Sequence, residues 1–124
     1  MRTVLAIGLG GAFGALARYA LQGLVNARVA SAFPWGTLAV NLSGCFLLGV
    51  LFTALTYRFA GPTWIRPTLT VGFLGAYTTF STWALESFNL LEARAYWLAA
   101  ANVLGSAGAG LVAMYVGVVA GRAL

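Results

Sequence analysis

The sequence contains no lysine, no histidine and no aspartate, and its charged side chains are seven arginines and two glutamates. Without histidine or aspartate, general acid–base catalysis has almost no candidate residues, so an enzyme is not expected. A His/Cys metal cluster is excluded as well, because the single cysteine, Cys45, has no second cysteine or histidine to join it. The arginines are scattered along the chain, so nucleic acid is not an expected partner.

Apolar residues dominate what is present. They make up 61% of the 124 residues, and charged residues make up only 7%, against about 25% in an average soluble domain. Four apolar runs are each close to the roughly 20 residues that a helix needs to cross a bilayer, and they lie at about 4–25, 37–57, 68–91 and 96–120. No run alternates apolar and polar residues at the two-residue period of a membrane barrel. We therefore predict an all-α, multi-pass membrane protein whose residues 1–124 form one domain of four transmembrane helices.

The arginines are divided almost evenly between the two ends of the predicted helices. Four spans place Arg2, Arg58, Arg66 and Arg122 on one side, Arg28 and Arg94 on the other, and Arg18 near that second side. An excess of arginine and lysine in the cytoplasmic loops normally sets the orientation of a membrane protein. Because this chain has almost no excess, we predict that it inserts in both orientations, which makes antiparallel pairs possible.

The third apolar run contains the stretch GFLGAYTTFSTWALE at residues 72–86, in which glycines and β-branched threonines weaken a helix. We predict that the helix breaks between Gly75 and Thr79. A break frees backbone carbonyls, which are tolerated at membrane depth only where they are buried in protein or line a cavity, and there they can hold a cation. The break is therefore a candidate ion site.

Small residues recur at four-residue spacing in several runs. The sets are Gly10 with Gly14, Ala101 with Gly105 and Ala109, and Gly117 with Gly121. This spacing lets helix backbones approach closely in lipid, so it predicts packing contacts.

Polar residues inside the apolar runs are the candidate functional residues, because a polar group in hydrocarbon is costly unless it is satisfied. They are Asn41, the pair Arg18 and Gln22, the pair Asn102 and Ser106, and the face formed by Thr79, Thr82 and Glu86 beside Phe80 and Trp83. Most of these groups donate hydrogen bonds, and aromatic ring edges are positive, so the set suits a small dehydrated anion. Plainer interpretations remain open: hydroxyls bonded to the carbonyl one turn back, an interhelical bond from Asn41, and packing by the two aromatic rings.

Three motifs resemble those of the Fluc (CrcB) fluoride channels: GGAFGALARY in the first run, PWGTLAVNLSG in the second and GFLGAYTTFSTWALE in the third. The resemblance covers essentially the whole chain. It implies an antiparallel, dual-topology homodimer with two pores, which exports toxic fluoride passively and selectively over chloride across the bacterial inner membrane. The expected partners are fluoride, a second copy of the chain and membrane lipid. The N-terminal run is expected to be a retained span, not a cleaved signal peptide.

The same resemblance implies particular site residues. The fluoride path would contain the asparagine Asn41, the aromatic pair Phe80 and Trp83, the hydroxyl residues Thr79, Ser81, Thr82 and Ser106, the vestibule arginine Arg18, and the glutamate Glu86. One cofactor is implied, a structural sodium ion at the dimer centre. The backbone carbonyls of Gly75 and Thr78 would hold it.

Two positions depart from the family pattern. Trp83 stands where the second aromatic residue is usually phenylalanine, and beyond Ser106 the fourth run has Gly110 and Met114 where a further hydroxyl is expected.

Two other functions are weighed against a fluoride channel. A small multidrug or guanidinium exporter would need a glutamate in the first span, which this chain lacks, and a non-transporting assembly subunit would need neither Asn41 nor a track of hydroxyls.

Overall fold

The computed structural model describes residues 1–58 and 61–123, and among these residues every regular element is a helix. The first long helix, α1, spans Arg2–Arg28, and the second, α2, spans Trp35–Tyr57. Both begin two residues before the runs that predicted them. Pro34 is the cap residue that precedes α2. The all-α prediction is confirmed for the described residues.

The third region consists of two helical halves. The first half continues from α3 (Ile65–Pro67) through a π-helical segment, η1 (Thr68–Leu74), to α4 (Gly75–Tyr77), and the second half is α5 (Phe80–Glu92). The third predicted run begins at residue 68, yet the helix already starts at Ile65. Residues 59 and 60 lie outside the described part. Pro67 is compatible with this start because it lies in the first helical turn, where no backbone N–H is required.

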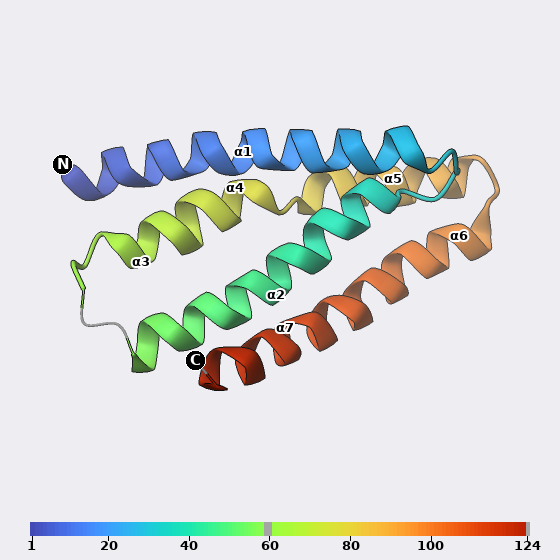
Figure 1. The fold of residues 1–124 in the computed structure, drawn as a ribbon. Coiled ribbons are helices and arrows are strands. Elements are labelled where there is room, and N and C mark those ends of the chain that lie inside the picture. Colours follow the sequence, from blue (N-terminus) through green and yellow to red (C-terminus); the bar gives the residue numbers. More distant parts are fainter. Residues whose placement is uncertain (59–60, 124) are drawn as a thin grey trace.

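The fourth region runs without interruption from residue 96 to residue 123. It is made of α6 (Tyr96–Ala100), a second π-helical segment, η2 (Ala101–Gly105), and α7 (Ser106–Ala123). A tight turn joins it to α5, in which the Ala95 N–H donates to the Leu90 carbonyl and Arg94 takes a positive φ of 57°. The fourth region therefore folds back beside α5, which agrees with the short gap between the predicted runs 68–91 and 96–120 (Figure 1).

Figure 1 shows the arrangement of these helices: α1 lies along the broken third region, and α2 crosses diagonally between that layer and α7. Within the described residues, three helices are long and apolar enough to cross a membrane, namely α1, α2 and the helix 96–123. The chain is therefore a multi-pass membrane protein. Both termini lie toward the end of the bundle that carries the connection from α2 to α3.

Close contacts between helices are made at glycines. A Cβ on Gly14 of α1 would overlap the Phe73 carbonyl in η1, and a Cβ on Gly117 of α7 would overlap the Phe46 carbonyl in α2. The packing predicted from the small residues of α1 and from the glycines near the end of α7 is thus present. A Cβ on Gly105 would meet no atom within 4 Å, so the predicted stripe around Gly105 makes no such contact within one chain.

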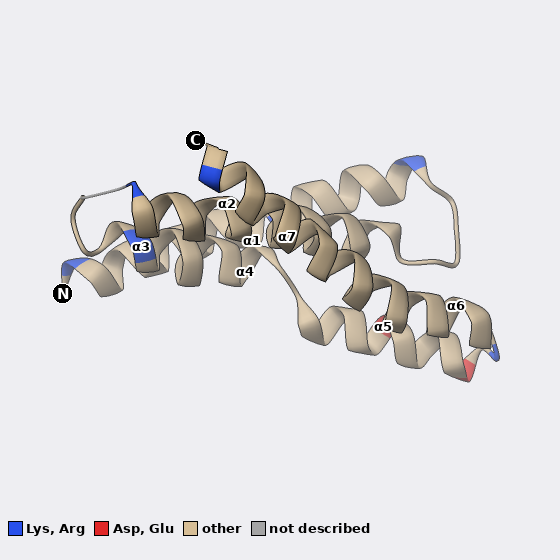
Figure 2. Cartoon of the chain, turned by 90° about the horizontal axis from the view of Figure 1, so that it is seen from below, with Lys and Arg blue, Asp and Glu red and all other residues tan. Residues whose placement is uncertain are grey.

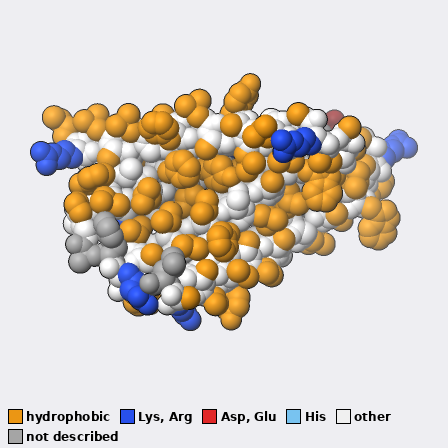
Figure 3. Space-filling model, viewed as in Figure 1, with side chains coloured by type: hydrophobic (Ala, Val, Ile, Leu, Met, Phe, Trp, Pro, Cys, Tyr) orange, Lys and Arg blue, Asp and Glu red, His pale blue; other side chains and the backbone are white. Residues whose placement is uncertain are grey.

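The face of the chain seen in Figure 3 is apolar over most of its length, and large hydrophobic side chains are exposed on every long helix. The hydrophobic side chains that are buried are few: Val40, Leu74, Tyr77, Leu90 and Ala99. The arginines lie mainly at the helix ends, as Figure 2 shows. A surface of this kind is stable only against lipid or against another apolar surface.

Candidate functional site

The break in the third region is two residues long. The helix α4 ends at Tyr77, and Thr78 and Thr79 have extended backbone conformations, with ψ angles of 158° and 117°. The helix resumes at Phe80. The break predicted between Gly75 and Thr79 is therefore confirmed, and it lies at the end of that interval.

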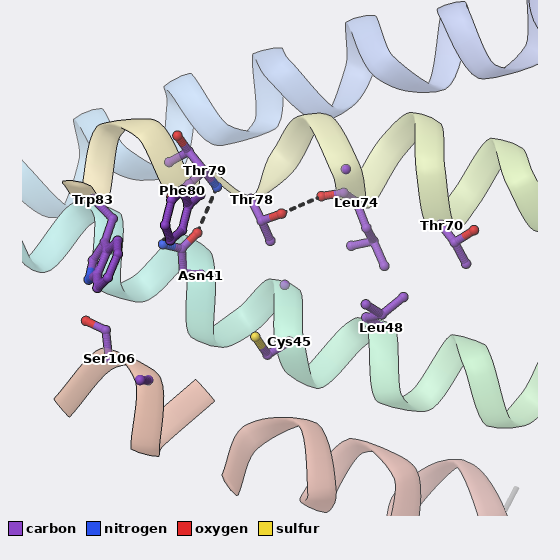
Figure 4. Close-up of a pocket in the computed structure, with 13 residues that line it drawn as sticks. Asn41, Cys45, Leu48, Thr70, Leu74, Thr78, Thr79, Phe80, Trp83 and Ser106 are labelled. Atoms are coloured by element: carbon purple, nitrogen blue, oxygen red, sulfur yellow. Dashed lines mark hydrogen bonds between the residues drawn. The ribbon is translucent and has the colours of Figure 1, made fainter. Parts of the chain in front are cut away.

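Asn41, on α2, is paired with the peptide groups of the break. The Thr79 N–H donates to Asn41 Oδ1 at 2.8 Å, and Asn41 Nδ2 donates to the Thr79 carbonyl at 3.0 Å (Figure 4). In an uninterrupted helix the Thr79 N–H would instead donate to the carbonyl four residues back, that of Gly75. The Asn41 carboxamide thus accepts the hydrogen bond that the Gly75 carbonyl would otherwise accept.

The Thr79 side chain has the corresponding effect on the other side of the break. Its Oγ1 accepts a hydrogen bond from the Thr82 N–H at 3.3 Å, as an N-cap residue does, and donates to Thr82 Oγ1 at 2.9 Å. The Thr82 N–H would otherwise donate to the carbonyl of Thr78. Two side chains, Asn41 and Thr79, therefore release the Gly75 and Thr78 carbonyls from helical hydrogen bonding.

A cavity of about 400 Å³ opens beside the break, and none of the described residues that line it is charged. It brings together seven of the predicted residues: Asn41, Gly75, Thr78, Thr79, Phe80, Trp83 and Ser106. Figure 4 shows Asn41, Phe80, Trp83 and Ser106 on the same side of it. The cavity lining does not include the other four, which are Arg18, Ser81, Thr82 and Glu86.

The aromatic pair forms part of the cavity wall. The ring centroids of Phe80 and Trp83 are 5.0 Å apart, and their planes are tilted by 39°. Phe80 is 77% exposed in the single chain, whereas Trp83 is half-buried. The Trp83 Nε1–H donates to the Asn102 carbonyl at 3.0 Å, so the indole is anchored to the fourth region.

Glu86 lies apart from the cavity and bonds to α2. Its Oε1 accepts from Thr37 Oγ1 at 2.8 Å, and Thr37 in turn accepts from Gln22 Nε2 at 2.9 Å. The other carboxylate oxygen, Oε2, is buried and has no hydrogen-bond partner among the described residues. Three helices, α1, α2 and α5, are thus linked at Thr37, which is 1% exposed.

The remaining predicted residues lie on helix surfaces. Arg18 is half-buried on α1, and Ser81 is exposed on α5. Thr82 is half-buried and bonded to Thr79. Sequence reasoning did not single out Thr37 or Cys45, which lines the cavity. The sequence did offer one signal for Thr37, because its hydroxyl lies one helical turn before Asn41 and therefore on the same face of the helix.

Comparison with known proteins shows one consistent relationship. The family described as "CrcB-like protein, Camphor Resistance (CrcB)" matches residues 5–118. Proteins named "Fluoride-specific ion channel FluC" are similar over nearly all of both chains. That of Magnetococcus marinus is 48% identical over 116 residues (94% of each chain), and that of Geobacter sulfurreducens is 47% identical over 124 residues (100% of each). That of Solibacter usitatus is 44% identical over 118 residues (95% of this chain and 97% of the other).

Proposed function

This chain belongs to the CrcB-like family, and we propose that it is a fluoride-selective ion channel that exports fluoride passively across the bacterial inner membrane. Relatives named as fluoride-specific ion channels share 44–48% of their residues with it over almost their whole length. At that similarity over the full length the fold is shared. Such a channel would relieve the toxicity of fluoride inside the cell.

The observation that carries the proposal is the uncharged cavity beside the helix break. Its polar lining groups are neutral, so a small anion meets no carboxylate there. Asn41 Nδ2 carries two protons, of which one bonds the Thr79 carbonyl, so the second is available to a fluoride ion. The edges of Phe80 and Trp83 add a weak positive field without the strong solvation that would trap the ion.

The channel would be an antiparallel homodimer of four-span chains with two fluoride paths. Support comes from the surface of the single chain, because Gly75 and Phe80 are both exposed on it. A Cβ on Gly75 would meet only the Thr70 carbonyl, at 3.7 Å, within its own chain. The glycine thus leaves room for a close approach by a second copy. Reporter fusions at the C-terminus should show activity on both sides of the membrane, and a single orientation in cells contradicts the antiparallel dimer.

A structural sodium ion would lie where the two breaks meet. The residues present fit this ion, because Asn41 and Thr79 leave the Gly75 and Thr78 carbonyls without their helical donors. Neutral oxygens suit a hard monovalent cation, and two chains related by a two-fold axis would supply four of them. A bound cation would offset part of the cost of placing anions nearby.

The test is fluoride efflux from liposomes that contain the purified protein, read with a fluoride electrode. Fast fluoride efflux with little chloride efflux is expected. Replacing sodium by a large organic cation on both sides should stop the flux, and tracer sodium should not move with fluoride. Proton-coupled guanidinium uptake with no fluoride efflux favours the exporter, although α1 has no carboxylate to couple protons. A protein that moves neither ion is the assembly subunit.

A further inference from the structure

The indole of Trp83 and the hydroxyl of Ser106 both bond to one residue, Asn102, which the fluoride path as proposed does not include. Asn102 lies in η2 and is 0% exposed. A buried carboxamide is costly unless its donors and acceptors are paired. The hydrogen bonds around Asn102 therefore indicate what it holds in place.

The direction of each hydrogen bond is determined by the protons available. Ser87 Oγ donates its one proton to the Trp83 carbonyl at 2.8 Å, so it can only accept from Asn102, whose Nδ2 lies 2.9 Å away. This fixes the orientation of the carboxamide and turns Oδ1 toward Ser106. Ser106 Oγ then donates to Asn102 Oδ1 at 3.2 Å.

The consequence for the cavity is that two apparent donors are already used. The only polar proton of the Trp83 side chain, on Nε1, is directed to the backbone carbonyl of Asn102 at 3.0 Å. The only proton of the Ser106 hydroxyl is directed to the Asn102 side chain. Both residues line the cavity (Figure 4), where Trp83 presents its ring and Ser106 presents lone pairs.

We propose that Asn102 is a positioning residue for the fluoride path, one that fixes the Trp83 ring at the cavity wall and directs the protons of Trp83 and Ser106 away from the ion. The proposal rests on the proposed channel function. It also explains how tryptophan can replace phenylalanine at position 83. An indole N–H facing the ion would be a strong donor that a phenylalanine lacks, and the backbone carbonyl of Asn102, held in place by the Asn102 side chain, accepts that proton instead.

A spectroscopic experiment tests the positioning without reference to transport. In protein labelled with ¹⁵N-tryptophan, the four tryptophans give four indole N–H signals, and Trp83→Phe identifies the signal of Trp83. Asn102→Ala keeps the backbone carbonyl that accepts from the indole but removes the side-chain hydrogen bond from Asn102 Nδ2 to Ser87 Oγ that ties residue 102 to α5. The variant should therefore shift the Trp83 signal and speed its exchange with D2O. The matched control is Asn89→Ala, which removes an exposed carboxamide from α5 and should leave the signal in place.

A flux experiment then tests the link to the ion. Asn102→Ala should lower fluoride efflux by roughly two- to tenfold, the factor that corresponds to one net hydrogen bond. The same change should lose most of its effect in a Trp83→Phe background, where there is no N–H to hold. Ser106→Ala should cost less flux than Asn102→Ala, because the Ser106 proton does not face the ion.

Three results overturn the proposal: an unmoved Trp83 indole signal in Asn102→Ala, equal effects of Asn102→Ala in the two backgrounds, or a larger loss from Ser106→Ala than from Asn102→Ala. If Asn102→Ala does not fold, Ser87→Ala removes the anchor of the carboxamide, together with the hydrogen bond from Ser87 Oγ to the Trp83 carbonyl, and it should shift the indole signal in the same direction. A wild-type protein that carries no fluoride disproves the proposed function alone, since the indole measurement is read independently.

Discussion

The two hydrogen bonds between Asn41 and Thr79 make Asn41→Asp the most informative single substitution in the chain. An aspartate keeps the acceptor for the Thr79 N–H. It also places a second oxygen against the Thr79 carbonyl, at the position from which Asn41 Nδ2 now donates over 3.0 Å. The lost hydrogen bond and the unpaired carbonyl together should destabilise the break by about 2–4 kcal/mol.

The substitution also adds a negative charge beside the fluoride path. At a separation of about 5 Å and an effective dielectric constant of about 20, two like charges repel by about 3 kcal/mol. That energy lowers the occupancy of fluoride by a factor on the order of 100. The two effects act in the same direction, so we expect fluoride efflux to fall at least 100-fold.

The assay is the liposome efflux measurement, with dimer formation checked by size-exclusion chromatography in detergent. Asn89→Asp is the matched control, because it makes the same chemical change at an exposed site on α5 and should conduct normally. Wild-type efflux from an intact Asn41→Asp dimer would refute both roles of Asn41, in the break and in the path.

Three further substitutions test other parts of the structure. Trp83→Ile should lose most fluoride efflux while Trp83→Phe conducts, because only the aromatic side chains offer a positive edge; equal efflux from both variants means that apolar bulk suffices. Gly14→Ala should lower the thermal unfolding midpoint, because its Cβ would overlap a backbone carbonyl of η1, whereas Gly8→Ala, which meets nothing within 4 Å, should not; equal midpoints contradict the close contact. Gly75→Val should yield helical monomers by circular dichroism and size-exclusion chromatography, while Thr78→Ser, which keeps the carbonyl and a hydroxyl, should form dimers; a normal Gly75→Val dimer excludes a close crossing there.

The existence of the break could be predicted from the sequence, and its position only in part. Glycines and threonines in an apolar run weaken the helix between Gly75 and Thr79, and that is a local property. The choice of Thr78 and Thr79 as the extended residues depends on Asn41, which is 38 positions away and supplies the hydrogen bonds that the break needs. No pattern within the third run contains that information.

The surroundings of Glu86 show the same limit. Helical periodicity placed Thr79, Thr82 and Glu86 on one face of the third run, and Thr79 does bond to Thr82. It could not show that Glu86 bonds to Thr37, a partner 49 positions away on another helix. The α3 start at Ile65 was missed for a different reason: the third run was predicted to begin at residue 68, after Pro67, but Pro67 falls in a helical turn that tolerates proline.

The two-residue break also creates two new helix ends of opposite polarity. The peptide dipoles of α5 sum to roughly +0.5 of an elementary charge at its N-terminus, which is at Phe80 beside the cavity. The half-helix that ends at Tyr77 carries a comparable negative partial charge, close to the carbonyls of Gly75 and Thr78. An anion and a cation can therefore each find a favourable helix end within a few residues, although no ionised side chain lines the cavity. A substitution that restored one continuous helix through residues 78 and 79 would abolish both fields at once.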